Sequence, residues 1–159
     1  MLQPCCTKKN ILLSLLEEIN FGRIFDIAEV RSPYFKSLLE RVLLRISEKM
    51  DIYEDGFGSI YEEPTISGED AEVTENGDIK IDSARLKKYE DDDEAMGVIA
   101  HELAHYHLSH HLESEYSLVL EKEADDLAKE WGFEIDKMRR VCGPPTYRKI
   151  YLESESNLS

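Results

Sequence analysis

The chain of 159 residues is poor in cysteine, in basic residues and in long apolar runs. Its cysteines are Cys5, Cys6 and Cys142; this odd number without a framework spacing argues against a disulfide scaffold and for a reducing, cytoplasmic location. No segment approaches the length of a membrane span, so no membrane partner is expected. Lysine and arginine number 19 against 34 acidic residues. This acidic excess argues against a nucleic-acid partner, because phosphate binding needs a basic face.

Proline and glycine are few as well, with five and eight residues, which leaves room for long regular elements. Residues 8–19 have the spacing of an amphipathic helix. Ser32-Pro33 is a typical helix start, and leucine, valine and isoleucine then recur at helical spacing to about Met50. From Asp51 to Ala71 glycine and proline mix with acidic residues, which predicts a loop.

A β-hairpin is predicted directly after this loop. Asn76-Gly77 is the favoured two-residue turn, because both positions tolerate positive φ. The flanking segments 71–74 and 78–82 are short, and isoleucine alternates with polar residues in the second of them.

The acidic cluster Asp91–Glu94 precedes a long apolar run and predicts a helix start, because acids suit the positive end of the helix dipole. The helical spacing continues to about His111. One line of side chains along this helix contains two histidines: Val98, His101, His105, Leu108 and Leu112. A second line beside it is apolar. We therefore expect a core helix that turns two histidines inward.

A further helix is predicted over roughly residues 115–131, with Gly132 as its natural C-terminal stop. The predicted fold class is α+β: a mostly helical domain with a histidine-bearing helix, a glutamate-bearing helix and a small antiparallel β-hairpin or sheet. We expect one domain overall, in which an N-terminal helical part, residues 1–70, packs on a core of residues 71–159.

The stretch His101-Glu102-Leu103-Ala104-His105 points to metal chemistry. Two histidines four apart on a helix lie nearly one above the other, so both rings can reach one zinc ion. A catalytic zinc keeps one position for water. Glu102 lies on the flank of the histidine line, where its carboxylate can act as general base toward a metal-activated water and pass the proton to the leaving amine.

A third ligand is expected on the following helix, within Glu121-Lys122-Glu123-Ala124-Asp125. Glu121 and Asp125 share one face with two alanines, whose small side chains allow a close approach to the histidine helix. Glu121 can then bind the metal while Asp125 accepts the other ring N–H of a ligand histidine. Glu123 points roughly the opposite way and is the alternative metal ligand, since at most one of the two glutamates can bind. An acid-rich surface helix without a metal is the competing interpretation.

These residues resemble the gluzincins, zinc peptidases in which a His-Glu-x-x-His helix is completed by a glutamate ligand. The likeness is greatest to the HtpX-like and CAAX-prenyl-protease-like branch and its short relatives, the minigluzincins, and it covers about residues 75–152. Asn76–Ile81 is similar to the strand before the helix in that branch, Asp91–Glu94 to its acidic lead-in, and Glu121–Asp125 to its Glu-x-x-Ala-Asp box. His110 stands where that branch often has a further histidine.

The resemblance implies a soluble metallopeptidase, most simply an endopeptidase with one zinc ion, that hydrolyses peptide bonds in a peptide or protein substrate. It also implies that a strand near Ile79–Ile81 lies along the cleft and holds an extended substrate by strand addition. Gly143 stands where the branch usually carries a histidine before its proline, so another group must stabilise the oxyanion. The candidates are Tyr147, Arg148 and Tyr151.

Two other functions agree with the same residues. The protein can be a latent peptidase, whose cleft is filled by its own tail, residues 153–159, or by the acidic loop of residues 51–71. It can also be a non-catalytic zinc-binding interaction domain, although such a site has no need of Glu102. The remaining histidines are expected at a solvated helix end rather than in a second metal site: His107, His110 and His111.

Overall fold

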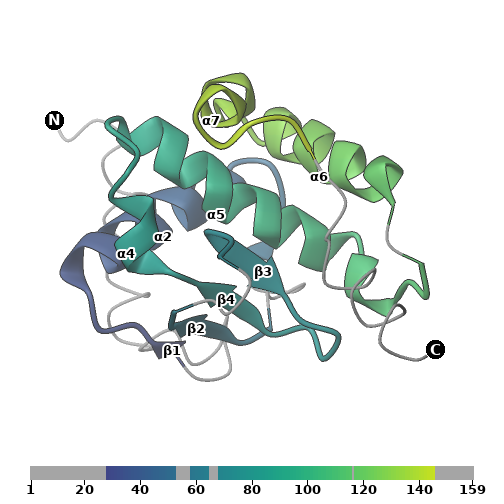
Figure 1. Ribbon diagram of the computed structural model, residues 1–159, viewed down its shortest axis with the longest axis horizontal. Coiled ribbons are helices and arrows are strands. Elements are labelled where there is room, and N and C mark those ends of the chain that lie inside the picture. Colours follow the sequence, from purple (N-terminus) through teal and green to yellow (C-terminus); the bar gives the residue numbers. More distant parts are fainter. Residues whose placement is uncertain (1–27, 53–57, 65–67, 116, 146–159) are drawn as a thin grey trace, which may run out of the picture.

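The computed structural model describes residues 28–52, 58–64, 68–115 and 117–145. Within them the chain forms an α+β fold, in which the long helix α5 (Asp92–His107) lies between a small sheet and two further helices (Figure 1). The predicted fold class is therefore confirmed. The helix predicted over residues 8–19 lies outside the described residues.

Helix α2 (Pro33–Ser47) begins where the sequence predicts. Ser32 has an extended backbone at the N-cap, and its Oγ accepts a hydrogen bond of 3.3 Å from the backbone N–H of Phe35. Pro33 occupies the first turn, where its missing N–H costs nothing. The helix packs against α5 with a continuous apolar face: Phe35, Leu38, Leu39, Val42, Leu43 and Ile46.

The sheet has four strands within the described residues, in the order β1-β2-β4-β3. Strands β3 (Ala71–Val73) and β4 (Ile79–Ile81) form the predicted antiparallel hairpin, with Gly77 at a φ of 82° in the turn. Strands β1 (Ala28–Glu29) and β2 (Ile60–Glu62) were not predicted, and they pair in parallel with β2 and β4 respectively. β2 lies within the stretch predicted to be a loop.

Strand β4 has a neighbour on each side, β2 and β3, so its backbone is used within the sheet. The expectation that the strand near Ile79–Ile81 binds an extended substrate is therefore wrong. Within the described residues β3 is the terminal strand on this side of the sheet, and it contacts α5. The short helix α4 (Ser83–Leu86) follows β4 and leads toward α5.

Helix α5 is enclosed by the rest of the fold. Asp91 caps it by accepting a hydrogen bond of 2.9 Å from the backbone N–H of Asp93, and the acidic first turn suits the helix dipole, as predicted. Every residue from Ala95 to His105 is buried, because α2 and the sheet cover parts of the helix and two later helices cover the remainder. The polar side chains of this stretch, His101, Glu102 and His105, are therefore buried too, which is costly unless they have partners.

The end of α5 differs from the prediction. The helix stops at His107 because Ser109 adopts a left-handed backbone with a φ of 59°, and the 3-10 helix η1 (His110–Leu112) follows. The inward line of side chains therefore does not extend beyond His105. Leu108 and Leu112, which were expected to continue it, are 38% and 73% exposed.

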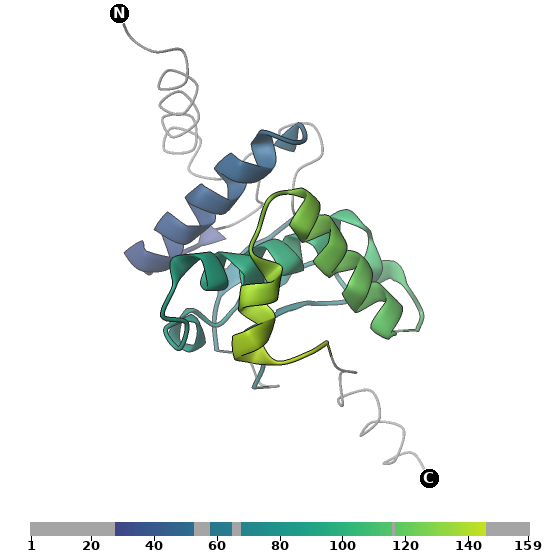
Figure 2. The same ribbon diagram turned by 90° about the horizontal axis from the view of Figure 1, so that it is seen from above.

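Helices α6 (Leu118–Glu130) and α7 (Ile135–Cys142) lie over α5 (Figure 2). Gly132, at a φ of 94°, follows α6 as the predicted stop, whereas α7 was not predicted. Gly97 of α5 permits the close approach of α7, since a Cβ at this position would lie 3.0 Å from Cβ of Met138. The buried face of α6 consists of two acids and two alanines, as expected: Glu121, Ala124, Asp125 and Ala128.

Candidate metal centre

Two histidine rings of α5 face the same point. His101 and His105 are one turn apart, and their ring centroids are 4.5 Å apart at an interplanar angle of 89°. The two Nε2 atoms are separated by 2.9 Å. The side chains are 8% and 3% exposed, so both nitrogens lie in a buried environment.

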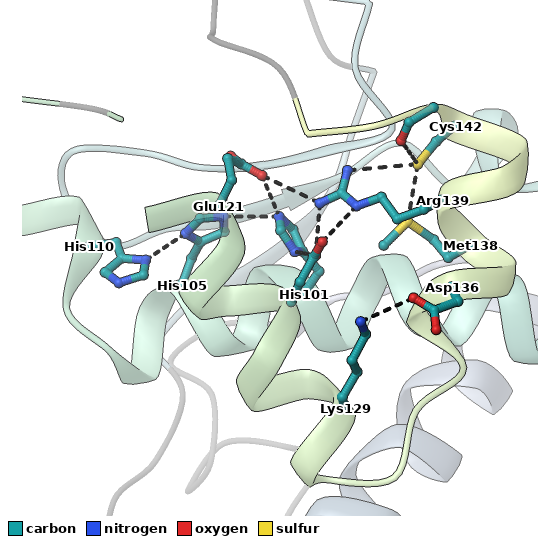
Figure 3. Close-up of polar contacts among 11 residues, drawn as sticks. His101, His105, His110, Glu121, Lys129, Asp136, Met138, Arg139 and Cys142 are labelled. Atoms are coloured by element: carbon teal, nitrogen blue, oxygen red, sulfur yellow. Dashed lines mark hydrogen bonds and ion pairs between the residues drawn. The ribbon is translucent and has the colours of Figure 1, made fainter. Parts of the chain in front are cut away.

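Helix α6 brings a carboxylate to this point (Figure 3). Oε2 of Glu121 lies 3.0 Å from Nε2 of His101, and Oε1 lies 3.4 Å from Nε2 of His105. Ala124 and Ala128 have no exposed surface, and their small side chains let α6 approach α5 closely. One donor atom from each of the three residues thus falls within 4.8 Å of the others.

Asp125 holds His101 from the other side of the ring. Its Oδ1 lies 2.8 Å from Nδ1 of His101, and because a carboxylate only accepts, Nδ1 carries a proton and donates it. Arg139 of α7 binds the same carboxylate with two hydrogen bonds. Its Nε donates to Oδ2 over 2.9 Å, and its Nη2 donates to Oδ1 over 2.8 Å. The guanidinium therefore orients the carboxylate, and the carboxylate orients the ring.

The histidines and the carboxylates of this cluster shift one another's pKa values. Burial lowers the pKa of His101, but hydrogen bonds to Asp125 and Glu121 outweigh it and raise that pKa from 6.5 to about 9. Burial prevails at His105 and lowers its pKa to about 4. Burial raises the pKa of Glu121, yet hydrogen bonds from the two histidines hold it well below its ordinary value. In the absence of a metal ion His101 therefore carries a proton that faces Glu121.

The converging atoms fit zinc. Imidazole nitrogen and carboxylate oxygen are ordinary zinc ligands, and a tetrahedral ion with bonds of about 2.0–2.1 Å separates its ligand atoms by about 3.3 Å. The corresponding separations here are 2.9, 3.0 and 3.4 Å. When His101 is neutral, its proton is on Nδ1, and the lone pair of its Nε2 faces a carboxylate oxygen. These two electron-rich atoms repel each other unless a cation lies between them. A proton or a metal ion can serve, and three protein donors are the number typical of catalytic zinc sites.

Glu102 lies beside these donors in a pocket of about 290 Å³. Its side chain is almost fully buried, at 5% exposure. The pocket reaches from the metal donors to the terminal strand β3 and to α7, and its lining includes Ala71, His101, Glu102, Glu121 and Arg139. A buried carboxylate in a pocket next to a metal donor set is where a general base is expected.

Glu123, the alternative metal ligand of the sequence analysis, lies apart from the three donors. Its Oε2 is 3.0 Å from Nε2 of His110, and Nδ1 of His110 is in turn 2.8 Å from Nδ1 of His105. His110 is only 5% exposed, so the expectation of a solvated side chain is wrong for it. His111 stacks on Tyr106 with ring centroids 5.2 Å apart.

Three proposed oxyanion stabilisers, Tyr147, Arg148 and Tyr151, lie outside the described residues, as does the tail of residues 153–159. Arg139 was not among the residues expected at the site, because its role depends on α7. The spacing of Ile135 and Met138, both buried, was a signal for a helix that would have placed Arg139 beside the core.

A sequence model described as Peptidase family M48 matches residues 36–124, more than half of the chain. The matched range includes all of α5 and the first half of α6, and thus the three converging donors and Glu102. No curated protein and no solved structure matches the chain. Among the described residues, no helix has the length and apolar character needed to cross a membrane.

Proposed function

The chain belongs to peptidase family M48, and on this premise we propose that it is a zinc-dependent endopeptidase whose metal is held by His101, His105 and Glu121. The observation that supports this most is the convergence of the three donors, two of which, His101 and Glu121, line one pocket together with Glu102. When bound, the zinc ion makes water more acidic and polarises a carbonyl group. The surrounding side chains hold the peptide and move the protons.

Glu102 is the proposed general base. It follows His101 directly, within the part of α5 in which every residue is buried, so its carboxylate is held on a rigid element at the edge of the donor set. It accepts a proton from the attacking water and returns it to the leaving amine. Such a positioned acid–base group contributes roughly a hundredfold to ten-thousandfold to the rate.

The peptide is proposed to lie along β3, at the pocket that residues of both β3 and α5 line. Ala71 of β3 lines this pocket together with Val98 and Glu102 of α5. Because β3 is the terminal strand among the described residues, an extended peptide beside it would continue the sheet. This arrangement replaces the earlier expectation that β4 binds the substrate.

The test is to measure zinc content and cleavage of a mixed peptide library for the wild type, Glu102→Gln and Glu130→Gln. Glu130 is exposed at the end of α6, so its variant controls for the loss of one carboxylate. We expect the wild type and Glu130→Gln to cleave peptides. Glu102→Gln should keep its zinc and lose roughly two to four orders of magnitude in rate. Equal cleavage by Glu102→Gln and the wild type would contradict the assignment of the base.

The same experiment separates the alternatives. Zinc retained without cleavage by any of the three proteins supports a non-catalytic zinc-binding interaction domain. Cleavage that appears only after trimming of the tail, residues 153–159, supports a latent peptidase. A wild type that retains no zinc contradicts the metal site itself.

A further inference from the structure

We propose that His110 and Glu123 are positioning residues, which fix the ring proton of His105 on Nδ1 and so keep its Nε2 lone pair directed at the metal. This inference rests on the proposed function, because it assigns a role to two residues around the same metal site. It also reassigns Glu123, which the sequence offered as an alternative metal ligand.

The three side chains form a chain of hydrogen bonds. Oε2 of Glu123 lies 3.0 Å from Nε2 of His110, and Nδ1 of His110 lies 2.8 Å from Nδ1 of His105. Figure 3 shows the rings of His110 and His105 turned toward each other at the second of these contacts. On the far side of the His105 ring, Nε2 faces Glu121.

The direction of these bonds follows from the carboxylate. Glu123 can only accept, so Nε2 of His110 must carry a proton and donate it. In a neutral ring the other nitrogen, Nδ1 of His110, is then an acceptor. Nδ1 of His105 faces that acceptor and must donate, which leaves Nε2 of His105 without a proton and with a lone pair that can bind a cation.

The local fold places His110 for this contact. After α5 ends, Ser109 turns the chain with a left-handed φ of 59°, and η1 brings His110 back against the helix. His110 is 5% exposed, although Ser109 directly before it and Leu112 two residues after it are exposed. A buried imidazole is costly unless both nitrogens have partners, and here each nitrogen has one.

The two metal histidines are therefore oriented by different groups. His101 donates directly to the carboxylate of Asp125, whereas His105 donates to the ring of His110, which in turn donates to Glu123. Glu123 is 53% exposed and lies only two residues beyond Glu121, so α6 supplies both a ligand to the metal and the end of this hydrogen-bond chain. The partner of a ligand histidine tunes metal affinity by orienting the ring and fixing its tautomer.

The first test compares zinc affinities by competition with a chelator, in His110→Phe, His110→Asn and the control His111→Phe. Phenylalanine removes the acceptor that faces His105, and the affinity should fall roughly 10- to 100-fold. Asparagine places its Oδ1 near the position of the former Nδ1, so the affinity should stay within roughly threefold of the wild type. His111 stacks on Tyr106 outside the chain of hydrogen bonds, and His111→Phe should match the wild type.

An unchanged affinity in His110→Phe, or an equal loss in the asparagine variant, would overturn the proposal. The wild type provides a second readout that does not depend on how the variants fold. Nitrogen-15 NMR of the zinc-loaded protein should show a proton on Nδ1 of His105 and on Nε2 of His110. A proton on Nδ1 of His110, or ligation by Nδ1 of His105, would also overturn it. Neither measurement uses peptide cleavage. A protein that binds zinc and cleaves no peptide would therefore refute the proposed function but not the role of His110 and Glu123.

Discussion

Replacing Glu121 by glutamine should destabilise the metal-free protein near pH 6.5 and should not destabilise it near pH 10. The Glu121 carboxylate is 10% exposed and lies 3.0 Å from Nε2 of His101. Burial opposes the charge on His101, but the hydrogen bonds that its ring donates to Asp125 and Glu121 raise its pKa from 6.5 to about 9. The folded protein thus binds this proton more tightly than the unfolded chain, and the resulting stabilisation is complete below pH 6.5 and lost as the pH rises through 9.

The magnitude follows from the same shift. A rise in pKa from 6.5 to about 9 corresponds to about 3 kcal/mol of free energy of unfolding. Asp125 and Glu121 both contribute, so the share of Glu121 is about 1–2 kcal/mol. Above pH 9 His101 is neutral, and glutamine then replaces a buried carboxylate that has lost its strongest cationic partner. The variant should accordingly equal or exceed the wild type in stability at that pH.

Urea unfolding in the presence of a chelator at pH 6.5 and near pH 10 measures this difference, with Glu130→Gln as the control on an exposed carboxylate. Glu130→Gln should follow the wild type at both values. A loss in Glu121→Gln that is the same at both pH values would refute the reasoning, because it would show that Glu121 stabilises the fold without the charge on His101.

Three further predictions follow from the described contacts. Zinc must displace the proton of His101, so zinc affinity measured by chelator competition should rise about tenfold per pH unit between pH 7 and 9 and then level off; a flat profile would contradict this. Gly97→Val should lower the free energy of unfolding by about 1–3 kcal/mol in a urea titration, because its side chain would meet Met138; unchanged stability would show that α7 does not depend on this contact. Tyr89→Phe should cost about 1 kcal/mol in the same assay, since the Tyr89 hydroxyl donates to Asp70 over 2.6 Å; no loss would show that this bond contributes nothing net.

Features that depend on local signals were predictable from the sequence. The turn at Asn76-Gly77, the N-cap at Ser32 and the start of α5 after Asp91 each rest on neighbouring residues, and the structure has all three. The approach of α6 to α5 was also predictable, because the alanines beside Glu121 and Asp125 form one face at helical spacing.

Features that depend on distant parts of the chain were not predictable. Ile60 lies in a stretch rich in glycine and acids, and its strand exists because it pairs with Ile79, which is far away in sequence. The early end of α5 follows from the left-handed backbone at Ser109, a conformation that serine seldom adopts. Arg139 and His110 became part of the site only through the packing of α7 and η1 against α5.

X-ray absorption spectroscopy of the zinc-loaded protein tests the central claim most directly, because it reports the ligands and their distances without an assay of activity. The account predicts one zinc ion bound by two imidazole nitrogens and by oxygen, at about 2.0–2.1 Å, with one imidazole lost in His101→Ala and in His105→Ala. A spectrum with sulfur or with one imidazole in the wild type would contradict the account, as would a zinc signal unaffected by both substitutions.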